Sequence, residues 1–126
     1  MTSTTYRWTG RTLTTLAILF MLFDSIGHLL MPAPVASAFA TLGFPASTAL
    51  GIGLLELALT VLYAIPRTAI AGAILLTGYL GGAIAVKVRI AAAPFDTLFP
   101  LIIAALIWGG VYLRDPRVRT LIFGQP

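Results

Sequence analysis

The sequence predicts an all-α fold: a four-helix transmembrane bundle with a short interfacial helix between helices 1 and 2. Of its 126 residues, 59% are hydrophobic and only 10% are charged, whereas a soluble domain carries about 25% charged residues. Four apolar segments have about the length that crosses a bilayer as a helix, and they lie at about residues 13–31, 48–65, 68–86 and 98–113. A chain of this length is expected to form one domain, residues 1–126.

The connections between these segments carry residues that end or begin helices. Pro32 ends the first segment, and Pro66 begins a tight turn after the second. Asp96 is the expected N-cap of the fourth helix, and Pro116 follows the end of that helix. These residues separate four distinct helices.

The connection between the first two helices contains an apolar stripe. Val35, Phe39 and Leu42 follow one another at i, i+4 and i+7, and Gly43 closes the piece. This spacing predicts a short amphipathic helix over residues 34–42 that lies in the membrane interface. A structureless hydrophobic loop is the alternative.

Positively charged residues are divided unevenly between the two ends of the predicted bundle. One end holds Lys87 and Arg89, and the other holds six arginines, namely Arg7, Arg11, Arg67, Arg114, Arg117 and Arg119. The positive-inside rule then predicts a multi-pass membrane protein with both termini cytoplasmic. Because the arginines lie at helix ends, they do not form a nucleic-acid patch, and no nucleic-acid partner is expected.

Several kinds of chemistry are excluded by the residues present. The chain has no cysteine, which excludes disulfides, thiolate catalysis and Cys-ligated metal or iron–sulfur sites. The sequence also lacks nucleotide-binding loops and nucleophile elbows.

Three ionisable side chains and a tyrosine interrupt the apolar segments. Asp24 and His28 lie in the first segment, Glu56 in the second and Tyr79 in the third. A charge at the bilayer centre costs roughly 2.5–3.5 kcal/mol or more, so such residues suggest a functional site. At about 1.5 Å per helical residue, Asp24, Glu56 and Tyr79 share one depth, and His28 lies about one turn nearer the outer face. Asp24 and His28 share a helix face because they are four residues apart.

These positions predict a polar pocket in the outer half of the bundle. Asp24, Glu56 and His28 are the candidate catalytic residues, and the candidate ligand-binding residues are Tyr79, Lys87, Ser25 and Thr60. At least one of the two carboxyls is expected to be protonated at neutral pH, unless His28 or Lys87 reaches it. Alternatively, the carboxyls form a structural clasp between helices, His28 is a core residue, and Lys87 extends to the interface. Two small-residue pairs, Gly78 with Gly82 and Gly81 with Ala85, predict close helix contacts within or between chains.

Several stretches resemble the DoxX-like family of small four-helix bacterial membrane proteins. They are Glu56 to Arg67 (ELALTVLYAIPR), Gly72 to Ala83 (GAILLTGYLGGA), Phe23-Asp24, and Tyr112 to Arg117 (YLRDPR). The resemblance covers nearly the whole chain and implies the fold and a location in a bacterial inner membrane. It also implies an association with a quinone-linked oxidoreductase. Lys87 departs from the family pattern, in which His is frequent at this position, so a role for His cannot be carried over there.

Three functions remain open at this point. In the first, a lipophilic small molecule such as a quinone or a terpenoid-like substrate binds in the pocket, and paired carboxylates perform acid–base chemistry of the isomerase or hydrolase type. In the second, the chain is a non-catalytic accessory subunit of a quinone-linked membrane oxidoreductase complex. In the third, Asp24, His28 and Glu56 bind a metal or haem. The cofactor stays undefined, membrane lipid is an expected partner, and a homo-oligomer is a further expectation.

Overall fold

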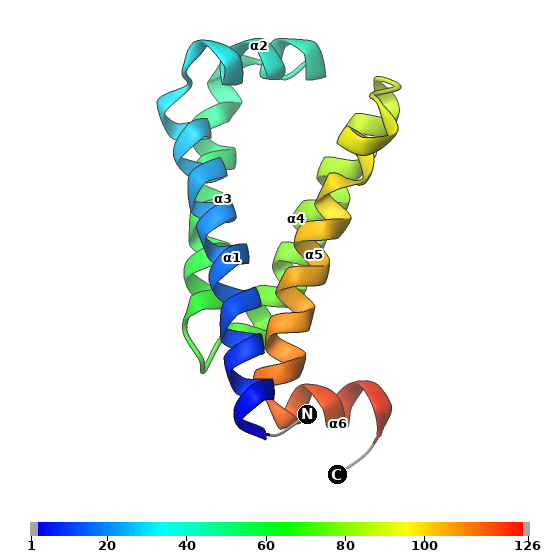
Figure 1. Cartoon of the computed structure of the whole chain (residues 1–126). Helices are drawn as coiled ribbons and strands as arrows, with labels where there is room; N and C mark the ends of the chain where they lie inside the picture. Colours follow the sequence, from blue (N-terminus) through cyan, green and yellow to red (C-terminus); the bar gives the residue numbers. More distant parts are fainter. Residues whose placement is uncertain (1–2, 125–126) are drawn as a thin grey trace.

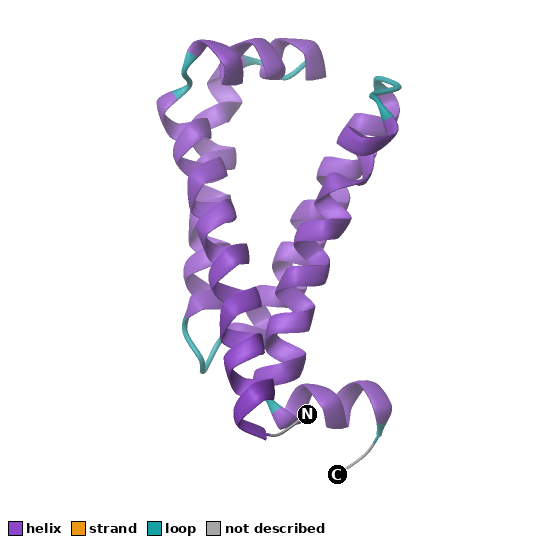
Figure 2. Ribbon diagram, viewed as in Figure 1, coloured by secondary structure: helices purple, strands orange, loops and turns teal. Residues whose placement is uncertain are grey.

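The computed structural model describes residues 3–124, which form helices joined by short turns (Figure 2). The helices are α1 (Ser3–Leu30), α2 (Ala33–Leu42), the short 3-10 helix η1 (Ala46–Thr48), α3 (Ala49–Ala64), α4 (Ala69–Arg89), α5 (Pro94–Arg114) and α6 (Pro116–Phe123). Four of them are long and apolar enough to cross a membrane. The predicted all-α bundle with a short helix between its first two spans is therefore confirmed.

Several helix boundaries differ from the prediction because the apolar segments mark only the part of each helix that matches the bilayer core. The first helix begins at Ser3, well before the expected residue 13, so Arg7 and Arg11 lie on helical turns. The prediction that Asp96 caps the fourth helix is wrong. Ala93 is the N-cap, and Pro94 occupies the first turn, where its fixed φ and missing N–H suit the start of a helix.

Beyond α5 the chain forms a further helix, α6, that the sequence did not predict. Pro116 follows the end of α5, as expected, but it also lies in the first turn of α6. The Asp115 carboxylate accepts a hydrogen bond of 2.9 Å from the backbone N–H of Arg117, which caps this helix. The Arg117 guanidinium, 2.8 Å from Asp115 Oδ2, lowers the pKa of Asp115, so the cap stays charged at neutral pH.

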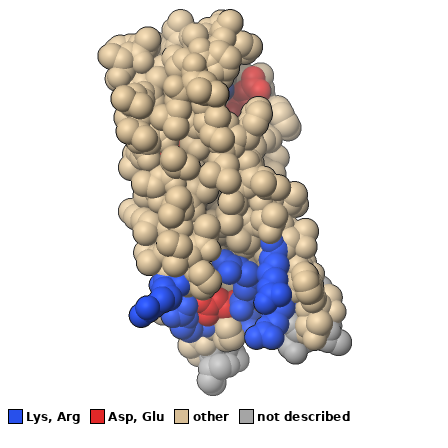
Figure 3. All heavy atoms as spheres, turned by 90° about the vertical axis from the view of Figure 1, so that its left-hand side faces the viewer, with Lys and Arg blue, Asp and Glu red and all other residues tan. Residues whose placement is uncertain are grey.

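The four long helices form a ring in which α1 packs on α3 and α5, and α4 packs on the same two helices. In Figure 1 the α1–α3 pair and the α4–α5 pair lie close together near the chain termini and diverge toward α2, which lies across the opposite end. Most positive charges gather at the end with the termini (Figure 3). We call this the arginine-rich end, and we call the other the α2 end.

Glycines account for the close approach of the helices at the arginine-rich end. An added Cβ at Gly10 of α1 would lie 2.9 Å from the Gly110 carbonyl oxygen of α5, and one at Gly72 of α4 would lie 2.6 Å from Tyr63 Cα of α3. Small residues at such crossings let helix backbones pack closely in a membrane.

The lateral surface of the bundle is apolar and its interior is closely packed. On α1, one face is exposed at Leu16, Leu19, Phe23, Ile26 and Leu30, with the three- and four-residue spacing of a single helix stripe. The opposite face is buried in a core with residues of the other helices, which includes Ala17, Met21, Leu59, Leu76, Ile107 and Val111. One face of each helix thus suits lipid, and the other suits the bundle.

The predicted small-residue contacts of α4 do not form within the chain. An added Cβ at Gly78, Gly81 or Gly82 would meet no heavy atom within 4 Å. The close contacts come from other glycines instead, because these three lie on the outward side of α4. A contact between chains at this surface stays a prediction.

Gly72 and Gly78 offer a matched test of this packing, because both lie in α4. Gly72→Ala should destabilise the protein by at least about 1 kcal/mol, since the backbone of α3 would have to move. Gly78→Ala should be neutral, or stabilising by up to about 1 kcal/mol through its helix propensity. Thermal unfolding in detergent measures both, and equal destabilisation by the two variants would contradict the helix packing described.

Candidate functional site

Glu56 lies at the centre of a polar cluster that joins three helices. Its side chain, on α3, is 0% exposed. His28 Nδ1 of α1 lies 3.1 Å from Glu56 Oε1, and the Tyr79 hydroxyl of α4 donates to the same oxygen over 3.1 Å. With Oε1 as the acceptor, Nδ1 of His28 carries the proton. A single buried carboxylate oxygen therefore links α1, α3 and α4.

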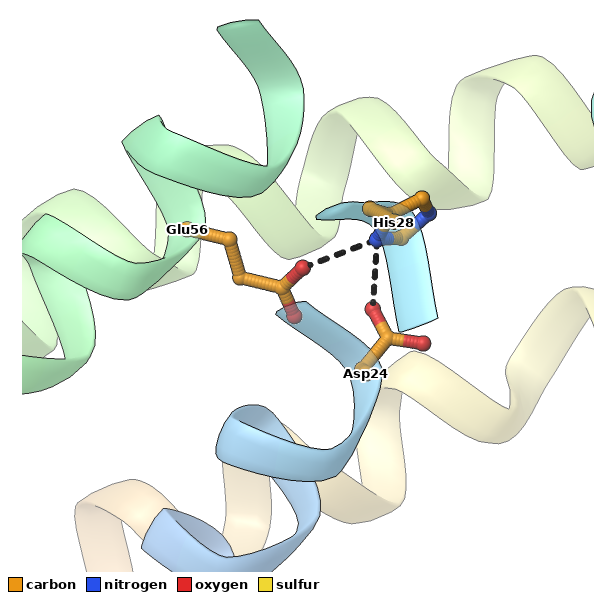
Figure 4. A group of neighbouring side chains, drawn as sticks. All are labelled: Asp24, His28 and Glu56. Carbon is orange, nitrogen blue, oxygen red and sulfur yellow. Dashed lines mark hydrogen bonds and ion pairs between the residues drawn. The ribbon is translucent and has the colours of Figure 1, made fainter. Parts of the chain in front are cut away.

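Asp24 extends the cluster toward the outside of the bundle. It lies one turn before His28 on α1, and its Oδ2 is 3.5 Å from His28 Nδ1 (Figure 4). The Asp24 side chain is 39% exposed, whereas that of His28 is 17% exposed. The same imidazole nitrogen therefore lies between an enclosed carboxylate and a more accessible one.

Local packing explains why α1 can bring His28 to Glu56. Gly53 lies one turn before Glu56 on α3, and an added Cβ there would lie 3.2 Å from His28 Cβ and 2.9 Å from Leu29 Cδ2. A larger residue at Gly53 would push the two helices apart. The close crossing at this glycine therefore sets the distance between the imidazole and the carboxylate.

The second oxygen of Glu56 has no partner. Oε2 is buried and makes no hydrogen bond within the described residues 3–124. A buried carboxylate oxygen without a donor is costly, and such exceptions call for an explanation such as a bound water, ion or ligand. This atom is the most informative feature of the site.

Helix α2 covers the cluster from the outer side. The ring of Phe39 lies 5.4 Å from the ring of His28, measured between centroids. The Arg89 guanidinium at the end of α4 donates a hydrogen bond to the Leu42 carbonyl at the end of α2. Helix α2 is thereby held between the α1–α3 pair and the end of α4. The apolar stripe at residues 34–42 predicted the helix, but its contact with His28 could not be seen in the sequence.

The other predicted ligand-binding residues lie apart from the hydrogen-bonded cluster. The Ser25 hydroxyl donates to the Leu22 carbonyl over 3.1 Å, and the Thr60 hydroxyl donates to the Glu56 carbonyl over 2.8 Å. Both hydroxyls are thus engaged within their own helix. Among the described residues, Lys87 makes no hydrogen bond or ion pair with the cluster. The structure therefore brings together Asp24, His28, Glu56 and Tyr79, while Ser25, Thr60 and Lys87 stay outside this network.

A second buried polar network lies deeper in the bundle, toward the arginine-rich end. The Tyr63 hydroxyl donates to the Ile107 carbonyl over 2.7 Å and lies 3.2 Å from the Thr14 hydroxyl. Thr14 was not singled out in the sequence. Because each of these groups has a partner, this network has the character of a structural contact.

The atoms of the cluster could also hold a cation. One ligand atom each from Asp24, His28 and Glu56 lies within 4.8 Å of the others. Two carboxylates and an imidazole are a donor set that suits zinc, manganese or iron. The unpartnered oxygen of Glu56 fits such a ligand as well as it fits a hydrogen-bond donor.

Comparison with known proteins agrees with this architecture. A family model for the DoxX-like family matches residues 12–110. The chain belongs to the DoxX-like family. The match runs from within α1 to near the end of α5 and includes every member of the polar cluster. No curated protein and no solved structure matches the chain. With four apolar helices, this DoxX-like chain is a multi-pass integral membrane protein.

Tyr79→Phe tests whether the bond to Glu56 contributes to stability. Its removal leaves Glu56 Oε1 with His28 as its one partner, and a hydrogen bond within a membrane contributes roughly 0.5–2 kcal/mol. We expect a lower unfolding temperature in detergent for this variant. Tyr6→Phe is the control, because the Tyr6 side chain is exposed. Equal unfolding temperatures for Tyr79→Phe and the wild type would show that this bond does not stabilise the bundle.

Proposed function

We propose that this DoxX-like protein binds a lipophilic small molecule whose polar group meets Asp24, His28 and Glu56. The observation that carries the proposal is the buried, unpartnered Oε2 of Glu56, because a ligand hydroxyl or other donor would complete its hydrogen bonding. Apolar walls with a few convergent polar groups are typical of small-molecule sites.

The position of the cluster supports a ligand that enters from the lipid. Asp24 is partly exposed, Glu56 is enclosed, and His28 lies within reach of both. The helix pairs diverge toward the α2 end, where the cluster lies (Figure 1). A long apolar molecule, such as a quinone or a terpenoid, could lie along the helices with its polar end at the cluster.

The cluster also has the groups needed for acid–base chemistry. Two carboxyls in different surroundings can hold their protons with different strength, which suits one as acid and the other as base. The Nδ1–H of His28 lies within reach of both carboxylates and can donate a hydrogen bond to either. An isomerase or hydrolase reaction would use this arrangement.

A divalent metal ion is a second candidate occupant, favoured by the three donor atoms within 4.8 Å of one another. Metal analysis of the purified protein separates the two candidates. Stoichiometric zinc, manganese or iron that is lost in Glu56→Gln would favour the metal.

A role as accessory subunit of a quinone-linked complex would appear as a stable partner protein that co-purifies.

Substitution of the two carboxyls tests the proposed site. Asp24→Asn and Glu56→Gln keep the side-chain volume but remove the exchangeable carboxyl proton, so binding of the lipophilic ligand should fall by at least about tenfold, or about 1.4 kcal/mol. Native mass spectrometry of the protein purified from membranes measures the ligand as an adduct. Asp96→Asn is the control, because Asp96 is exposed on the first turn of α5. An unchanged amount of ligand adduct in both variants would refute the proposed site and would show that the carboxyls only join the helices.

We propose further that both termini face the cytoplasm of a bacterial cell, because the arginines gather at one end of the bundle (Figure 3). Since the chain has no cysteine, single cysteines can report the orientation. Thr120→Cys, on α6, should be shielded from a membrane-impermeant thiol reagent in intact cells, whereas Ala93→Cys, between α4 and α5, should react. The reverse pattern would invert the topology.

A further inference from the structure

A second candidate site lies at the arginine-rich end, remote from the polar cluster. A cavity of about 330 Å³ lies between the start of α1, the end of α5 and the start of α6. Its lining includes Thr4, Tyr6, Arg7, Leu113, Arg114 and Arg119. Every residue that lines this cavity is outside the part of the chain that matches the family model. The cavity is thus independent of the function proposed for the cluster.

The charge of the cavity is entirely positive. Three of its lining residues are arginines and none is acidic. The neighbouring carboxylate of Asp115 is engaged by Arg117, whose Nη2 lies 2.8 Å from Asp115 Oδ2. None of the three cavity arginines makes an ion pair within residues 3–124, and Arg114 acts on Asp115 only through its charge. Guanidinium groups that gather without acidic partners are suited to a phosphate.

The fold holds these arginines in place. The crossing of α1 and α5 at Gly10 and Gly110 puts Gly10 against the aliphatic part of Arg114, and Arg7 lies one turn before Gly10 on α1. The Arg119 guanidinium donates to the Tyr112 carbonyl and lies over the Tyr112 ring, 5.9 Å from its centroid. The Nε of Arg114 is buried and has no partner among the described residues. That N–H is a donor that an anion could satisfy.

The surroundings of the cavity indicate which kind of molecule would carry the phosphate. Helix α6 crosses the end of the bundle (Figure 1), and beyond its buried Val118 it exposes Leu121, Ile122 and Phe123. On α1, Trp8 is also 61% exposed. Apolar side chains beside arginines, on a helix at the end of a membrane bundle, are typical of a segment that lies at the headgroup level.

We infer that this cavity binds the phosphate group of an anionic phospholipid, held by Arg7, Arg114 and Arg119. The acyl chains would lie against the apolar sides of α1 and α5, and the phosphate would accept hydrogen bonds from the guanidiniums. A soluble phosphate ester has the same charged group, but it lacks the chains that the flanking lipid surface accommodates.

Native mass spectrometry of the full chain, with phosphatidylglycerol or phosphatidylcholine added, tests this inference. Phosphatidylglycerol adducts should exceed phosphatidylcholine adducts on the wild type. Each arginine removed near an anionic headgroup should lower binding by about fivefold, so Arg7→Gln should lose phosphatidylglycerol by about that factor and Arg7→Gln with Arg119→Gln by more. Arg7 is exposed, so its substitution alone should leave the fold intact.

Arg67→Gln is the matched control, since Arg67 is an exposed arginine at the same end of the bundle but outside the cavity. It removes the same charge and should leave phosphatidylglycerol binding unchanged. Equal loss in Arg67→Gln and Arg7→Gln, or equal binding of the two lipids by the wild type, would overturn the inference. Displacement of phosphatidylglycerol by millimolar glycerol phosphate or inorganic phosphate would assign the cavity to a soluble phosphate. That result would overturn the inference that the phosphate belongs to a phospholipid.

Discussion

A buried carboxylate in a membrane-spanning helix must be satisfied by the protein or by something the protein binds, and this constraint shapes the α2 end of the bundle. Glu56 lies inside the bundle at 0% exposure. One of its oxygens receives bonds from His28 and Tyr79, on helices to either side of α3. Because lipid offers no hydrogen-bond donors to replace them, separation of these helices would leave the carboxylate unsatisfied. The contact therefore orients α1, α3 and α4 around one oxygen.

The two halves of the bundle are held together by different means. At the arginine-rich end, Gly10, Gly72 and Gly110 let backbones approach closely, and the buried core lies between the helices. At the α2 end the helices are joined by hydrogen bonds. Those of Glu56 link α3 to α1 and α4, and that of Arg89 links α4 to α2. Apolar packing is non-directional, whereas hydrogen bonds fix particular atoms. The polar half is thus the half in which a bound molecule can be recognised by its own polar group.

The sequence predicts much of this fold because lipid imposes simple patterns. Apolar length marks the four spans, and the i, i+4 spacing of Asp24 and His28 places both on one face. Helix depth aligns Asp24 with Glu56 and Tyr79 and places His28 about one turn away. The start of α1 and the existence of α6 escape prediction, since short helical segments outside the bilayer core are not marked by a long apolar run. Capping by Asp115 was visible only as an Asp-Pro pair.

The individual side-chain contacts in the site could not be predicted from the sequence, for a different reason. Lys87 shares a face with Tyr79 but lies two turns away, and a helical pattern does not show whether a flexible side chain reaches a neighbour. Ser25 and Thr60 lie on buried faces, yet their hydroxyls donate to carbonyls of their own helices. Such local hydrogen bonds compete with hydrogen bonds to other helices. The small-residue pairs of α4 likewise indicated a close contact without showing on which side of the helix a partner lies.

An experimental density map of the wild-type protein in lipid nanodiscs would test the central claim most directly. The claim is that the cluster of Asp24, His28 and Glu56 receives a ligand. It predicts density for a non-protein molecule larger than water within hydrogen-bond distance of Glu56 Oε2. A map in which Oε2 is enclosed by protein alone, or meets a single water, would contradict the claim and leave the cluster as a clasp between helices.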